Sequence, residues 1–102
     1  MTPIFKWKGQ YFGFIHNENL FYADGAYLGW IEDGQVWADD GAYVGDVVEK
    51  NYILRRTNIT PPLPKTPRIR PIQPIRAIQQ LNRSGRMPKA GWVDALEGLK
   101  RA

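Results

Sequence analysis

The side chains that could carry out acid–base or nucleophilic chemistry are few in this 102-residue chain. The single histidine, His16, and the single serine, Ser84, are far apart in the sequence. A serine nucleophile needs a base within hydrogen-bonding reach and a third group that orients the base, and nothing in the sequence supplies that set. Adjacent acids at 32–33 and 39–40 do not have the spacing of a calcium-binding loop. We therefore expect no enzyme activity, no cofactor and no bound metal.

The chain contains no cysteine, which excludes disulfides, thiolate metal sites and cysteine nucleophiles. Its N-terminal segment lacks the apolar core of a signal peptide. No stretch approaches the roughly 20 apolar residues that a membrane-spanning helix needs. A cytoplasmic location without a membrane span is expected.

Aromatic and basic side chains offer the chemistry of recognition instead. Three tryptophans (Trp7, Trp30 and Trp37) could stack on bases, and basic residues could contact phosphates: Arg68, Arg70, Arg76, Arg83, Arg86 and Lys89. The aromatic half is the acidic half, however. Residues 1–56 carry five Lys or Arg against eight Asp or Glu, whereas residues 57–102 carry nine against two. This separation does not favour nucleic-acid binding; it favours docking of the basic half on an acidic body, its own or a neighbour's.

A 16-residue repeat must position these side chains. Gly9, Gly25 and Gly41 are 16 residues apart, and a second set of glycines (Gly13, Gly29 and Gly45) keeps the same spacing. Asp-Gly at 24–25 and 40–41 predicts type I′ hairpin turns, which need positive φ at both central residues. Further turns are predicted at 17–19, 33–34 and 50–51. Residues 9–56 are therefore interpreted as three tandem hairpin units.

The predicted fold is an all-β antiparallel meander of about seven strands, at residues 4–7, 11–15, 20–23, 26–31, 36–38, 42–49 and 52–55. Side chains alternate along a strand, so Tyr27 and Ile31 share one face while Leu28 and Trp30 share the other. Both faces are apolar and both need cover, from the rest of the chain or from other copies. The mid-strand glycines predict either a groove or a surface over which cross-strand aromatic rings fold.

Residues 57–83 are predicted to form a basic, proline-rich arm. Prolines recur every third residue at 61, 64 and 67, and so do five apolar residues: Ile69, Ile72, Ile75, Ile78 and Leu81. Polyproline II has three residues per turn, so this spacing predicts an apolar stripe that can dock in an aromatic groove. A short helix after Pro74 is the alternative for residues 75–83. Residues 84–102 are predicted to be a linker and a short amphipathic helix, with Trp92 as its anchor and Leu96 and Leu99 on the same face.

The Gly-x-Tyr-x-Gly steps at 25–29 and 41–45, the run 28–34 and the proline-periodic segment resemble the four-fold β-flower family of small bacterial proteins. The resemblance spans roughly residues 4–75. It implies a β assembly with approximate four-fold symmetry. The family has no established activity, so the resemblance implies no catalytic or binding residue.

A second resemblance involves Gly29-Trp30, residues 35–37 and Asp40-Gly41, which are similar to the choline-binding repeats of bacterial cell-wall proteins. Those repeats cage a quaternary ammonium between aromatic rings. The 16-residue period here is shorter than theirs, and tryptophan occupies both positions in only one unit.

These observations predict three regions: a β-repeat domain (1–56), a basic arm (57–83), and a linker with a short helix (84–102). The predicted function is that of a protein-interaction or assembly module whose partner is itself, as a homo-oligomer, or another protein. A nucleic-acid-binding module and a cell-wall ligand binder are the alternatives. The candidate interaction residues are Trp7, Tyr27, Trp30, Trp37, Tyr43, Ile69, Ile72, Ile75, Arg68, Arg70 and Trp92.

Overall fold

The computed structural model describes residues 2–58, 60, 62–68, 81–85, 87 and 89–98. Its elements are β1 (Thr2–Phe5), β2 (Tyr11–His16), β3 (Asn19–Tyr22), β4 (Tyr27–Glu32), β5 (Gln35–Ala38), β6 (Tyr43–Val48), β7 (Tyr52–Arg56), β8 (Trp92–Asp94) and a 3-10 helix, η1 (Ala95–Gly98). Each strand pairs with the next along the chain in an antiparallel manner. A parallel pairing of Phe5 with Tyr52 joins β1 to β7. The predicted all-β meander is thus confirmed, and its first seven strands close into a barrel.

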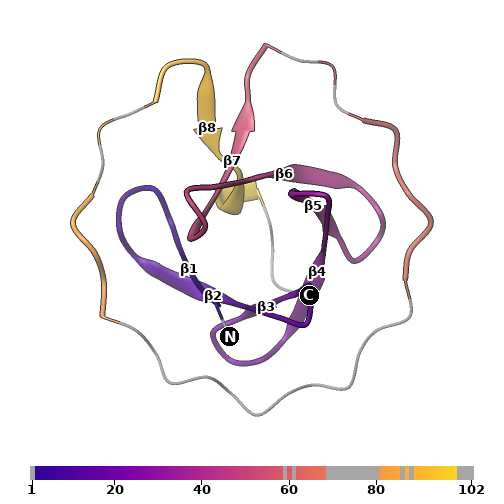
Figure 1. Cartoon of the computed structure of the whole chain (residues 1–102), viewed down its shortest axis with the longest axis horizontal. Helices are drawn as coiled ribbons and strands as arrows, with labels where there is room; N and C mark the ends of the chain where they lie inside the picture. The colour runs from indigo at the N-terminus through magenta and orange to yellow at the C-terminus, as the bar shows by residue number, and fades with distance from the viewer. Residues whose placement is uncertain are drawn as a thin grey trace.

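Four hairpins radiate from the barrel, and we call them petals (Figure 1). The first petal is β1–β2, the second β3–β4, the third β5–β6 and the fourth β7–β8. The first three have short tips, at residues 6–10, 23–26 and 39–42. The fourth has residues 57–91 between its strands, and we call this segment the arm. Its described stretches lie outside the barrel on opposite sides (Figure 1).

A β-bulge recurs at the middle residue of each Tyr-x-Gly step. The pairing register skips Phe12 between β1 and β2, Leu28 between β3 and β4, and Val44 between β5 and β6. A bulge bends and twists its strand. Here it lets the bulged side chain pack with the barrel core while the preceding tyrosine lies outside the barrel. This geometry explains why both faces of the strands are apolar.

The glycine that follows each bulge is required by the neighbouring strand. A Cβ on Gly13 or Gly29 would overlap a backbone carbonyl oxygen, of Phe21 or Trp37 respectively. On Gly45 it would lie 2.6 Å from the Leu54 oxygen. Because backbone atoms already fill these positions, the groove predicted along the glycines is wrong.

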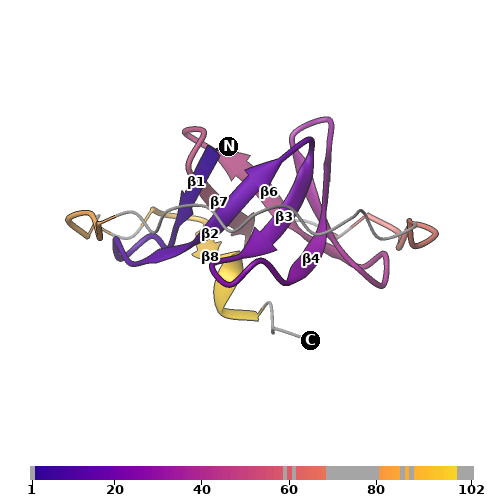
Figure 2. The ribbon, with the colours of Figure 1, turned by 90° about the horizontal axis from the view of Figure 1, so that it is seen from below.

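The barrel core contains aliphatic and aromatic side chains from the strands, together with two from the C-terminal segment: Ile4, Phe12, Leu20, Leu28, Val36, Ile53, Ala95 and Leu96. Ala95 and Leu96 belong to η1, which lies at one end of the barrel (Figure 2). The C-terminal segment therefore completes the core of a barrel built by residues 2–56.

The petal tips differ from the predicted type I′ turns. Gly25 and Gly41 have positive φ, of 90° and 92°, but Asp24 and Asp40 do not. Instead the carboxylates of these aspartates accept hydrogen bonds from the backbone N–H groups two residues later. The opposite turns do contain paired left-handed residues: Asn17 and Glu18, Asp33 and Gly34, and Glu49 and Lys50. The last of these lies one residue earlier than predicted.

The C-terminal segment also differs from the prediction. Trp92 lies in β8, where it pairs with Arg56, and does not begin a helix. The Asp94 carboxylate accepts a hydrogen bond from the Leu96 N–H, and the 3-10 turn starts there. Pairing with β7 outweighs the weak preference of so short a segment for an α-helix. Leu99 lies outside the described residues.

Candidate functional site

The outer surface of the first three petals carries a recurring pair of aromatic rings. Edge-to-face pairs join Phe5 to Tyr11, Phe21 to Tyr27 and Trp37 to Tyr43, with centroids 5.8, 6.0 and 5.6 Å apart. A further ring stacks on the pair in two petals: Phe14 on Phe21, and Trp30 on Trp37. These contacts stabilise each petal beyond the burial of apolar area. They also provide flat aromatic faces beneath the arm.

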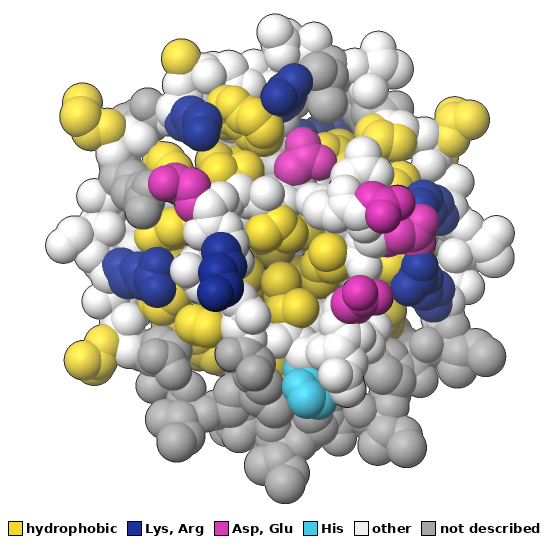
Figure 3. All heavy atoms as spheres, in the orientation of Figure 1, with side chains coloured by type: hydrophobic (Ala, Val, Ile, Leu, Met, Phe, Trp, Pro, Cys, Tyr) yellow, Lys and Arg dark blue, Asp and Glu magenta, His cyan; other side chains and the backbone are white. Residues whose placement is uncertain are grey.

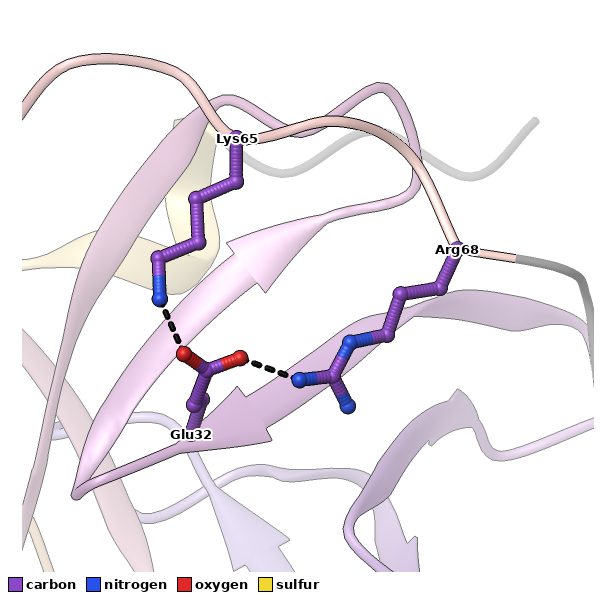
Figure 4. A network of polar contacts seen from close by, with 3 residues as sticks. All are labelled: Glu32, Lys65 and Arg68. Carbon is purple, nitrogen blue, oxygen red and sulfur yellow. Dashed lines mark hydrogen bonds and ion pairs between the residues drawn. The ribbon is translucent and has the colours of Figure 1, made fainter.

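The arm docks on the third petal through its backbone and two cations. The Lys65 N–H donates a 2.8 Å hydrogen bond to the Gly41 carbonyl oxygen. The Lys65 ammonium lies 4.6 Å from the Trp37 ring centroid, and the Arg68 guanidinium lies 5.0 Å from that of Trp30. Both cations form ion pairs with the Glu32 carboxylate (Figure 4). Each cation is therefore held between an aromatic face and one shared carboxylate.

The electrostatics of this site follow from those contacts. The hydrogen bond from Lys65 is the main reason why the pKa of the Glu32 carboxyl lies below its ordinary value of 4.5. Water reaches this carboxylate, so the ion pairs are screened and contribute more to geometry than to stability. Tyr43, beside Trp37, donates a hydrogen bond to Asp46. Burial and that bond raise the pKa of Tyr43 to about 12.

The arm docks on the first petal by the same rule. The Arg83 N–H donates a 2.7 Å hydrogen bond to the Gly9 carbonyl oxygen. The Arg83 guanidinium lies 4.2 Å from the Phe5 ring centroid and 6.0 Å from that of Tyr52. At both petals a basic residue donates its N–H to the tip glycine and places its cation on the neighbouring rings. A Cβ on either tip glycine would overlap the carbonyl oxygen of that arm residue.

The end of the arm is held near the base of the fourth petal. The Trp7 indole N–H donates a hydrogen bond to the Met87 carbonyl, and the Trp7 backbone N–H donates to the Asp94 carboxylate. The Trp92 ring lies beneath two cations, Arg56 at 4.9 Å and Lys89 at 5.6 Å. Trp92 thus contacts both the end of β7 and the end of the arm.

The candidate residues predicted from the sequence lie in three places. Trp30, Trp37, Tyr43 and Arg68 come together at the third petal, Tyr27 belongs to the second petal, and Trp7 and Trp92 lie near the end of the arm. The remaining candidates, Ile69, Ile72, Ile75 and Arg70, lie outside the described residues.

Burial corrects the predicted use of the aromatic residues. Trp30 is 0% exposed and Trp37 is 1% exposed within a single chain. An exposed aromatic sheet face is therefore absent at these rings, and neither indole is available for stacking on a base. Around the barrel, polar side chains surround a central group of apolar ones (Figure 3).

Sequence reasoning missed Glu32 and Lys65 as docking residues. Gly9 and Gly41 stood out as repeat markers, but the prediction explained them by the turns alone. The expected apolar stripe is also wrong at its one described member, because Leu81 is 91% exposed. The excess of cations in the arm was the available signal, and it did not identify their partners.

Within the described part of the chain, no group of three or more His, Cys, Asp or Glu residues could hold a metal ion. No helix in that part is long and apolar enough to cross a membrane.

Comparison with known proteins places this arrangement in a family. Searches of curated proteins and of solved structures found no match. The family model of the 4-fold beta flower protein matches residues 2–95, which include all eight strands and the arm. The earlier resemblance is confirmed over a longer stretch than the motifs alone suggested, and the chain belongs to the four-fold β-flower family.

Proposed function

We propose that the protein is a non-enzymatic interaction module that assembles with copies of itself by exchanging arms. The observation that carries the proposal is that the C-terminal segment completes the barrel from outside it. Ala95 and Leu96 reach the core only after the 35 residues of the arm, numbered 57–91. The same segment of a second copy offers the same contacts, which is the basis of domain swapping.

The kind of contact that holds the arm supports exchange. In its described stretches, the arm meets the first and third petals through single backbone hydrogen bonds, at Gly9 and Gly41. Strands β1–β7, by contrast, are joined by continuous pairing. The arm can therefore leave these petals without breaking the closed sheet, and the excess positive charge of residues 57–102 favours the acidic body of a neighbour.

The mass in solution tests self-assembly. Light scattering on the full chain over a range of concentrations should show a dimer or larger species that grows with concentration. High salt should weaken assembly only slightly, because the core contacts of Leu96 are apolar. A monomer at every concentration would overturn the proposal.

A disulfide reports whether the assembly exchanges arms. Arg55 in β7 pairs with Val93 in β8, and neighbouring strands bring paired Cα atoms within the range of a disulfide. The double variant Arg55→Cys, Val93→Cys introduces the only two thiols of the chain. Oxidation at assembling concentrations should give a covalent dimer on a non-reducing gel. A covalent monomer alone would show assembly without exchange, and Arg55→Cys alone is the control for random cross-linking.

A further inference from the structure

We infer that the third petal is a binding site for a lysine or arginine side chain carried by an extended, proline-flanked peptide of another protein. The arm is the resident occupant of this site in the single chain. Such a site does not depend on self-assembly, because its docking geometry is complete within one molecule.

Three parts of the petal match three parts of such a ligand. The Gly41 carbonyl accepts a backbone N–H, the rings of Trp30 and Trp37 accept cations on their faces, and the Glu32 carboxylate neutralises the charge. Cations are attracted to the faces of aromatic rings, most strongly to tryptophan. The ligand backbone must be extended, because the tip glycine is approached so closely that even a methyl group on it would collide.

The first petal shows which features of the ligand matter. There an arginine, Arg83, takes the place of Lys65, and Phe5 and Tyr52 take the place of the tryptophans. The shared requirements are therefore a basic residue and its own N–H, and not lysine in particular. Lys65 has prolines at positions 64 and 67, and proline favours the extended backbone that meets the glycine.

The distance between petals sets the spacing of cations in a longer ligand. Lys65 and Arg83 are 18 residues apart in sequence and dock on petals at opposite sides of the barrel (Figure 1). At about 3.1 Å per residue, an extended chain of that length covers roughly 55 Å. The molecule measures 37 by 35 Å across, so half of its perimeter is also roughly 55 Å. A ligand that reads adjacent petals should carry cations about nine residues apart.

The resident arm does not satisfy every polar group of the site. The indole N–H groups of Trp30 and Trp37 are buried and have no hydrogen-bond partner among the described residues. A buried donor without an acceptor is unfavourable. A foreign peptide that brings an acceptor to these groups would have an advantage over the arm.

Peptide binding to the full chain tests this inference. The double variant Lys65→Ala, Arg68→Ala removes the resident cations and leaves the petal intact. A synthetic peptide with the sequence of residues 60–70 is titrated against it, and tryptophan fluorescence reports occupation of the petal. We expect saturable binding that is at least tenfold tighter than binding to the unmodified chain, because the resident arm no longer competes. A peptide with its lysine and arginines replaced by alanine should bind at least tenfold more weakly.

The controls keep each result informative. A circular-dichroism spectrum like that of the unmodified chain shows that the double variant is folded; if it is not, Glu32→Gln replaces it, and the cationic peptide should then bind several-fold more weakly than to the unmodified chain. Equal binding of the neutral peptide, or no saturable binding to a folded variant, would overturn the inference. Light scattering on the same samples separates the two proposals, since a monomer that binds the peptide supports the site and contradicts self-assembly.

Discussion

The barrel and the arm belong to one chain but are stabilised by different forces. The barrel has a continuous ring of strand pairing around a core in which Ile4, Leu20 and Val36 are 0% exposed. The described arm has isolated backbone bonds, cations on aromatic faces, and apolar side chains such as Leu63 left 86% exposed. Stability of the barrel should therefore depend on shape and volume, whereas attachment of the arm should depend on charge. The comparison teaches that a low-energy attachment can cover a hydrophobic surface without becoming part of the core.

The largest effect should come from closing the space between two strands of the barrel. Gly29→Ala places a methyl group on the Trp37 carbonyl oxygen, so the sheet must shift, and we expect a loss of about 3 kcal/mol. Chemical denaturation measures this loss. Gly34→Ala is the matched control, because its Cβ would meet open space at a φ of 77° and should cost only about 1 kcal/mol. Equal losses for the two variants would contradict the close-approach argument.

Removal of the C-terminal contribution to the core should have the next largest effect. Leu96 is 2% exposed within the core, so Leu96→Ala should lower the free energy of unfolding by about 2.5 kcal/mol. Leu63→Ala in the arm should change it by less than about 0.5 kcal/mol. Thermal unfolding of the two variants measures the difference. A loss for Leu63→Ala as large as that for Leu96→Ala would show that the arm is packed like the core.

A turn of the barrel offers a stabilising change of intermediate size. Glu18 has a φ of 63°, which is strained for a residue with a side chain. Gly34 takes the equivalent place in the next turn without that strain, so Glu18→Gly should stabilise the fold by about 0.5–1 kcal/mol. The melting temperature should rise. An unchanged or lower melting temperature would show that Glu18 makes a compensating contact.

Acid should affect the arm with the smallest change in overall stability. Because the pKa of Glu32 is held below 4.5 in the folded state, its contribution is complete above pH 4.5 and is lost as the pH falls through the lower folded value. Glu32→Gln should remove this part of the pH dependence and leave the barrel transition unchanged. Tryptophan fluorescence between pH 7 and pH 3, at low and high salt, compares the two chains. Identical acid responses would show that Glu32 does not anchor the arm.

Much of the fold was predictable because it is local and repeated. The 16-residue spacing of the glycines indicated the strands and their meander, since turn residues and alternation act over a few positions. The Tyr-x-Gly steps also marked the bulges, although the sequence did not reveal that the intervening Phe12 and Leu28 would face the core. The type I′ assignment at Asp24 and Asp40 failed because Asp-Gly also suits a turn in which only the glycine has positive φ.

The candidate site was less predictable because it joins distant residues. The sequence indicated the aromatic and basic residues of the site by type, including Trp30, Trp37 and Arg68. It did not indicate that Lys65 and Arg68 would share Glu32, more than 30 residues away. Charges have no periodic pattern that specifies their partners, so only the path of the arm past each petal could assign them.

The amino-acid sequence by itself determined the strands, their order, the acidic body and the basic arm. Each follows from spacing and composition, which act along the chain. Only the tertiary structure decided that β1 and β7 close the barrel, that Leu96 completes its core, and that the arm covers Trp37 of its own chain. These contacts join residues far apart in sequence, and their free energy depends on a geometry that exists only once the barrel has formed.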